Sequence, residues 1–104
     1  MVSLVNEEIL AIAARLREVL APKHIYLYGS FAKGNARPDS DYDFYVVVPD
    51  DAGAPLELSR QAYDAIRDLK RRPADIIIKH ESVFNQRAKH NTIEQTVLQE
   101  GVEL

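Results

Sequence analysis

The chain has 104 residues, a formal net charge of −3 at pH 7 and no cysteine. We expect residues 1–104 to form a single domain around one core. The lack of cysteine excludes disulfides, thiolate metal sites and a cysteine nucleophile, and the negative charge argues against a globally basic surface for nucleic-acid binding. No apolar run approaches membrane-spanning length and no signal-peptide pattern opens the chain, so we expect a cytoplasmic protein.

The first predicted element is an amphipathic helix from Ser3 to Leu20. Its apolar residues recur at helical spacing and are Ile9, Ile12, Leu16, Val19 and Leu20. Ser3 is a suitable N-cap, and Pro22 cannot continue the helix. We interpret this helix as a packing element rather than a chemical one.

A strand predicted over His24–Tyr28 leads into Gly29 and Ser30. Glycine lets the backbone approach a ligand closely, and a serine that opens a short helix can offer its hydroxyl and N–H groups to a phosphate. The helical turn Phe31–Gly34 follows, with Gly34 expected in the left-handed closing conformation. The alternative for an isolated Gly-Ser pair is an ordinary strand-to-helix turn. Lys33 is either a phosphate contact or a surface lysine.

The aromatic and β-branched residues of Asp41–Val48 predict a second strand, which follows a turn through Asp39 and Ser40. Side chains alternate across a strand, so Asp41 and Asp43 point to the same face. Two adjacent carboxylates repel each other unless a cation lies between them, and Mg²⁺ prefers such hard oxygen ligands. The pair therefore predicts a magnesium site.

A second amphipathic helix is predicted over Leu56–Lys70, with Tyr63 as a packing residue. Next comes a short apolar strand, Asp75–Ile78, which we expect in the interior of the sheet. If this strand lies beside Asp41–Val48, Asp75 supplies a third carboxylate for two-metal chemistry. The alternative is that Asp75 caps a turn or pairs with Arg72.

The C-terminal part predicts two short helices. His80 and Glu81 are interpreted as a loop without a metal role, and the helix Ser82–Lys89 follows. A capping-box pattern at Thr92 begins the last helix, which ends at Gly101. The residues expected on its core face are Ile93, Val97 and Leu98.

These elements predict a small α/β domain with a mixed sheet covered by helices. The Gly-Ser turn, the spacing of ten residues, the Asp-x-Asp strand and the later strand with a third Asp resemble the minimal nucleotidyltransferase family of the DNA polymerase beta-like superfamily. The resemblance spans nearly the whole chain. It implies the small nucleotidyltransferase fold, ATP as substrate and Mg²⁺ as cofactor. The site residues that it implies are Asp41, Asp43 and Asp75 for metal and catalysis, and Gly29, Ser30 and Lys33 for the nucleotide.

Many members of that family are encoded beside a HEPN-domain ribonuclease toxin and transfer AMP from ATP to a tyrosine of the toxin. The resemblance thus implies a protein adenylyltransferase antitoxin, with a HEPN toxin as partner and no membrane or nucleic acid bound directly. Two alternatives stay open. One is a non-catalytic antitoxin that masks the toxin by binding it, and the other is transfer to a small molecule such as an aminoglycoside.

Overall fold

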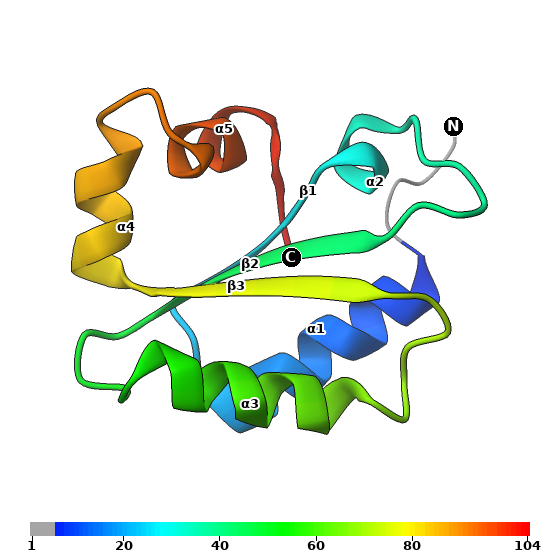
Figure 1. The fold of residues 1–104 in the computed structure, drawn as a ribbon, viewed down its shortest axis with the longest axis horizontal. Helices are drawn as coiled ribbons and strands as arrows, with labels where there is room; N and C mark the ends of the chain where they lie inside the picture. The colour runs from blue at the N-terminus through cyan, green and yellow to red at the C-terminus, as the bar shows by residue number, and fades with distance from the viewer. Residues whose placement is uncertain (1–5) are drawn as a thin grey trace.

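The computed structural model describes residues 6–104, which form a sheet flanked by helices (Figure 1). In chain order the elements are α1 (Glu7–Leu20), β1 (His24–Tyr28), α2 (Ser30–Lys33), β2 (Tyr42–Val48), α3 (Pro55–Ile66), β3 (Ala74–His80), α4 (Glu81–Ala88), α5 (Ile93–Glu100) and β4 (Val102–Glu103). The sequence-based prediction of an α/β domain with a mixed sheet is confirmed.

The strand order across the sheet is β3-β2-β1-β4. β1 runs antiparallel to both β2 and β4, whereas β2 and β3 are parallel. Parallel neighbours need a crossover connection, and α3 provides it between β2 and β3. This pairing confirms the expected adjacency of the two acidic strands, although β3 is an edge strand rather than an interior one.

Helices cover both faces of the sheet (Figure 1). α1 and α3 lie on one face, and the larger apolar cluster fills the space between them and the strands. α4 and α5 lie on the other face, over one end of the sheet, where a smaller cluster is built from Tyr26, Tyr45, Val47, Phe84 and Val97. The α4/α5 face is therefore packed mainly at one end.

The start of α1 differs from the prediction. Asn6 is the N-cap, and its side chain accepts a hydrogen bond of 2.8 Å from the N–H of Ile9. The predicted cap, Ser3, lies outside the described residues. Val19 was expected in the core but is 40% exposed, because Ala13 rather than Val19 turns toward the sheet.

The other boundaries shift where the chain must turn. α3 ends at Ile66 rather than Lys70, because the chain has to reverse before β3 and the N–H groups of Leu69 and Lys70 both bond to Ile66 O. β3 extends to His80, since its parallel pairing with β2 continues to Val48, and α4 begins at the next residue. The prediction of a loop at His80 and Glu81 was therefore wrong.

α5 confirms its predicted start, but of its three predicted core residues only Val97 is buried. Thr92 is the N-cap and accepts a hydrogen bond from Gln95 N–H. Ile93 and Leu98 are exposed, whereas the Glu94 side chain is only 1% exposed. The two-residue strand β4, which follows α5, was not predicted.

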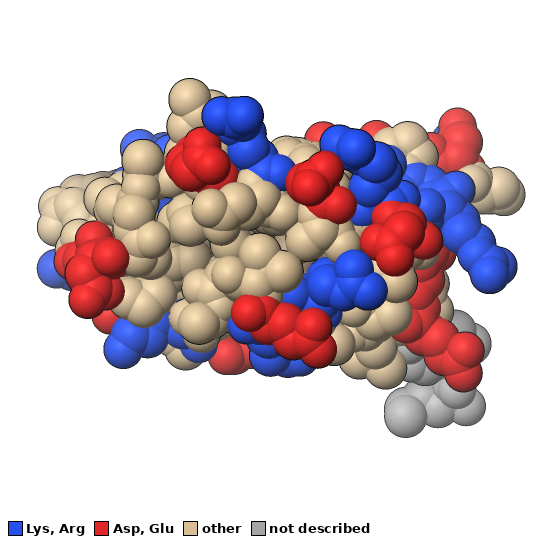
Figure 2. All heavy atoms as spheres, turned by 90° about the horizontal axis from the view of Figure 1, so that it is seen from below, with Lys and Arg blue, Asp and Glu red and all other residues tan. Residues whose placement is uncertain are grey.

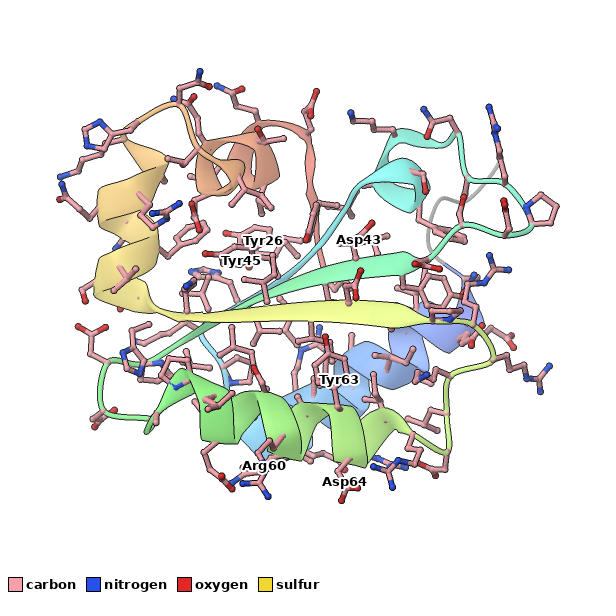
Figure 3. All side chains as sticks on the ribbon, in the orientation of Figure 1. Tyr26, Asp43, Tyr45, Arg60, Tyr63 and Asp64 are labelled. Carbon is pink, nitrogen blue, oxygen red and sulfur yellow. The ribbon has the colours of Figure 1, made fainter. Side chains whose placement is uncertain are left out.

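Charged side chains of both signs alternate over the face that α1 and α3 form (Figure 2). Two ion pairs along α3, Glu57–Arg60 and Asp64–Arg67, contribute to this mixture. Arg60 and Asp64 point away from the sheet, whereas Tyr63 points toward it (Figure 3). Within residues 6–104, no helix combines the length and the apolar character needed to cross a bilayer.

Candidate functional site

Three polar side chains form a row across three adjacent strands. Asp43 on β2 is paired in register with Tyr28 on β1 and with Asp75 on β3. Residues paired across neighbouring strands project from the same face of the sheet. Asp43 points from β2 toward the side that carries α2, α4 and α5 (Figure 3). The sheet thus places Asp43 beside Asp75, as the sequence hypothesis required.

Gly29 packs directly against this row. Its backbone angles are φ 76° and ψ −153°, a conformation that is essentially restricted to glycine. A Cβ atom at this position would lie 2.4 Å from Oδ2 of Asp43, well inside van der Waals contact. Gly29 is therefore required both for the turn out of β1 and for the close approach of the turn to the Asp43 carboxylate.

The helical turn α2 begins immediately after Gly29. The carbonyl of Ser30 accepts hydrogen bonds from the N–H groups of Gly34 and Asn35, and Gly34 has φ 76°, which confirms the predicted left-handed closing residue. Ser30 is half-buried at the start of the turn. The Lys33 ammonium lies 3.7 Å from a carboxylate oxygen of Glu100, so this lysine forms an exposed ion pair with the end of α5.

Burial and neighbouring negative charges raise the pKa values of two residues in the row, Asp43 and Tyr28. Burial, together with the carboxylates of Asp75 and Asp41, raises the pKa of Asp43. Burial and the charges of Asp43 and Asp75 also raise the pKa of Tyr28 to about 12. Within residues 6–104, no Lys, Arg or His side chain forms an ion pair with the carboxylates of Asp41, Asp43 or Asp75. The site therefore concentrates negative charge for which residues 6–104 provide no ion-pair partner.

The donor chemistry of the site fits a hard divalent cation, because its acidic side chains offer oxygen ligands and lack a compensating charge. Asp43 and Asp75 are register partners, and Asp41 lies one residue before β2. In the described part of the chain, however, no three His, Cys, Asp or Glu side chains are close enough together to form a ready-made metal site. The three predicted ligands are thus brought to one end of the sheet without being fully assembled.

Sequence reasoning did not identify Tyr28 as part of this row or Arg72 as a neighbour of the site. Tyr28 ends β1, and only the antiparallel register with β2 places its side chain beside Asp43. Arg72 was considered only as an ion-pair partner of Asp75. Its guanidinium instead donates a hydrogen bond of 3.0 Å to Ser40 O, next to Asp41.

The architecture, a small mixed sheet with a glycine turn packed against an acidic strand, is that of a nucleotidyltransferase domain. The family described as "Polymerase beta, Nucleotidyltransferase" matches residues 7–104, and the chain belongs to this family.

One solved structure has a similar fold and is described as "Crystal structure of the toxin-antitoxin with AMP-PNP". The TM-score is 0.56, the sequence identity is 23%, and the similarity covers 94% of this chain and 72% of that chain. A comparison with curated proteins finds no match.

Proposed function

We propose that the protein is a Mg²⁺-dependent adenylyltransferase that acts as an antitoxin by transferring AMP from ATP to a tyrosine of a HEPN ribonuclease toxin. The observation that carries the proposal is the contact between Gly29 and Asp43, with Asp75 in register beside them. This arrangement puts a turn suited to phosphate next to carboxylates suited to metal, in a chain of the polymerase beta nucleotidyltransferase family.

Each predicted site residue has a role in this proposal. The backbone of Gly29 and the N–H and hydroxyl groups of Ser30 bind the triphosphate tail, and Lys33 exchanges its exposed partner Glu100 for a phosphate oxygen. Asp41, Asp43 and Asp75 would hold Mg²⁺, which when bound neutralises the phosphate charge and the charge that develops on the leaving group. The raised pKa of Asp43 supports a cation beside it, because a cation relieves the repulsion among the carboxylates.

The reaction requires an acceptor that approaches the row from the edge of the sheet formed by β3. Asp75 is exposed and lies on the edge strand β3, so an acceptor hydroxyl can reach it. The hydroxyl oxygen forms a bond to the α-phosphorus of ATP while the bond between that phosphorus and the β-phosphate oxygen breaks. Pyrophosphate leaves, and the hydroxyl proton passes to the Asp75 carboxylate.

The choice of a toxin as acceptor rests on the resemblance to the minimal nucleotidyltransferase family, whose antitoxin members the spacing of the Gly-Ser and Asp-x-Asp motifs fits. The solved structure with a similar fold is a toxin–antitoxin that contains AMP-PNP, an analogue of ATP, and this agrees with the proposed partner and nucleotide. Asp43 is half-buried and Asp75 is exposed, so a second molecule can reach both carboxylates. This accessibility supports an acceptor on another protein.

One observation favours a second candidate, an antitoxin that neutralises its toxin by binding without chemistry. The predicted metal ligands are not assembled into a cluster of three in the described residues. A vestigial site would have this property. The adenylyltransferase is the better candidate because the Gly29 turn keeps its close approach to the Asp43 carboxylate, a contact that a vestigial site would not need.

The test is to incubate the purified protein with Mg²⁺, α-phosphate-labelled ATP and a lysate of its source cells. Wild type and Asp51→Asn should label one protein, whose modified residue mass spectrometry should identify as tyrosine. Asp43→Asn should leave it unlabelled. Asp51 is a matched control because it is an exposed acid in the loop after β2. Equal capture of a toxin by wild type and Asp43→Asn, with no label from either, would support the binding-only antitoxin.

A further inference from the structure

Arg72 lies between the two motifs of the candidate site and contacts residues adjacent to both. Its guanidinium carbon is 5.0 Å from the centroid of the Phe31 ring and 5.3 Å from that of Tyr42. The same guanidinium donates hydrogen bonds to the carbonyls of Ser40, at 3.0 Å, and Pro38, at 3.4 Å. One side chain therefore joins α2, the α2–β2 loop and the start of β2.

The two rings that Arg72 contacts belong to neighbours of the site residues. Phe31 follows Ser30 in the sequence, and Tyr42 lies between Asp41 and Asp43. The rings also contact each other, with centroids 4.7 Å apart and planes inclined at 59°. Because side chains alternate along β2, Tyr42 projects to the α1/α3 face while Asp43 projects to the opposite face. Arg72, Phe31 and Tyr42 form the Arg72 cluster, which supports the site from the side of the sheet opposite to Asp43.

The cluster is anchored on its far side. Tyr42 is fully buried, and its hydroxyl donates a hydrogen bond of 2.6 Å to Glu8 and accepts one of 3.2 Å from Asn6. The backbone N–H of Arg71 donates to the same Glu8 carboxylate. Arg72 is therefore fixed relative to α1, and a fixed guanidinium can fix the loop that carries Asp41.

We propose that Arg72 is a positioning residue that sets the distance between the Gly29-Ser30 turn and the carboxylates of Asp41 and Asp43. This inference deepens the proposed function and rests on it for the effect on nucleotide. We do not expect a lysine to replace Arg72 in this role, because an ammonium lacks the planar, delocalised guanidinium that faces two rings while its Nη1 donates to two carbonyls.

The first test measures the loop without any nucleotide. Three amides report on its order: Arg37 N–H bonds to the Ser40 hydroxyl, Ser40 N–H to Arg37 O, and Tyr42 N–H to Pro73 O. In Arg72→Lys these amides should exchange with deuterium at least about threefold faster, while amides in the middle of α1 and α3 keep their rates. Arg71→Lys is the matched control, because the Arg71 side chain is exposed and its backbone contact to Glu8 remains.

The second test measures binding of AMP-PNP as a function of Mg²⁺ concentration. Arg72→Lys should raise the Mg²⁺ concentration for half-maximal binding by about 3- to 30-fold, because the half-buried side chain loses part of its cation–π contact with the two rings and of its hydrogen bonds. Arg71→Lys should not change it. In a Phe31→Leu background the additional effect of Arg72→Lys should be smaller than in wild type, because one of the two ring contacts of Arg72 is already lost.

The outcomes separate the two proposals. If wild type binds no AMP-PNP at any Mg²⁺ concentration, the proposed function is wrong, and the exchange rates still decide whether Arg72 holds the loop. If the loop amides exchange equally fast in wild type and Arg72→Lys, the positioning role is overturned whatever the nucleotide does. If all amides of the protein exchange faster in Arg72→Lys, Arg72 stabilises the whole fold, and the positioning role is again overturned.

Discussion

Two clusters on the same face of the sheet are built from similar residues and differ in one respect. In the first, the Tyr45 hydroxyl donates a hydrogen bond of 2.7 Å to Glu94, and the Arg87 guanidinium donates another of 2.8 Å. In the second, Tyr28, Asp43 and Asp75 lie in a row without any cation from the described residues. Each cluster combines tyrosine and carboxylate, but only the first contains an arginine.

The hydrogen-bond donors in the first cluster, Tyr45 and Arg87, reverse the direction of the carboxylate pKa. Burial tends to raise the pKa of Glu94, yet the hydrogen bonds from Tyr45 and Arg87 and the charge of Arg87 lower it overall. For Asp43, burial and the charges of Asp75 and Asp41 all raise the pKa. The first cluster is therefore complete as a structural element, whereas the second has the charge imbalance that an external cation would correct.

The largest expected effect is the loss of transfer in Asp43→Asn. Under the proposed function, removing a carboxylate that would hold Mg²⁺ should lower AMP transfer by about 1,000-fold or more, because metal-assisted charge stabilisation supplies several kcal/mol. In the absence of Mg²⁺ the unfolding temperature should stay the same or rise, since a repulsive charge is removed. Transfer assays and thermal unfolding of the same samples measure both. A large fall in unfolding temperature would show that Asp43 is structural, as Glu94 is.

The opposite behaviour is expected at the first cluster. Glu94→Ala should destabilise the fold by about 2–4 kcal/mol, because it leaves the buried Tyr45 hydroxyl and the Arg87 guanidinium without their partner. Denaturant unfolding measures the change. The control on the same helix is Glu100→Gln, whose exposed ion pair with Lys33 should be worth less than about 0.5 kcal/mol. Equal effects of the two substitutions would contradict the structural role of Glu94.

A smaller effect is expected when the glycine beside Asp43 is replaced. Gly29→Ala should cost about 1–3 kcal/mol for the backbone conformation and should also weaken Mg²⁺-dependent binding of AMP-PNP, because the new Cβ displaces the Asp43 carboxylate. Gly53→Ala is the matched control. Gly53 also has a positive φ, of 117°, but a Cβ there meets nothing within 4 Å. Gly53→Ala should therefore lose stability and keep nucleotide binding, and weakened binding in both variants would contradict the contact argument.

The smallest expected effect is a pH dependence that belongs to the first cluster. The pKa of folded Glu94 is lowered below its ordinary value of 4.5, so its ionised form adds stability above that value. This contribution is lost as the pH falls through the lower, folded pKa. The stability difference between wild type and Glu94→Gln should therefore be constant near neutral pH and shrink below pH 4.5. Urea unfolding at a series of pH values measures it, and a difference that grows with acidification would be the wrong sign.

The local signals in the sequence determined much of the fold. The range of β1, the left-handed Gly34, the capping of α5 by Thr92 and the position of the acidic strand β2 all agree with the prediction. These features depend on residues a few positions apart, through alternation, turn chemistry and caps, so a single segment contains the information. The candidate residues Gly29, Asp41 and Asp43 follow from the same local patterns, and their functional roles stay predictions.

Only the tertiary structure decided the features that depend on distant segments. The sequence could not establish the register of Asp43 with Asp75 and Tyr28, the contacts of Arg72 or the pairing of β4 with β1. The clearest case is α5, where helical spacing correctly predicted Val97 in the core but also predicted Ile93 and Leu98, which are exposed, and missed the buried Glu94. A carboxylate is buried when partners satisfy it, and the partners here, Tyr45 and Arg87, come from β2 and α4, which only the assembled fold brings within hydrogen-bonding distance.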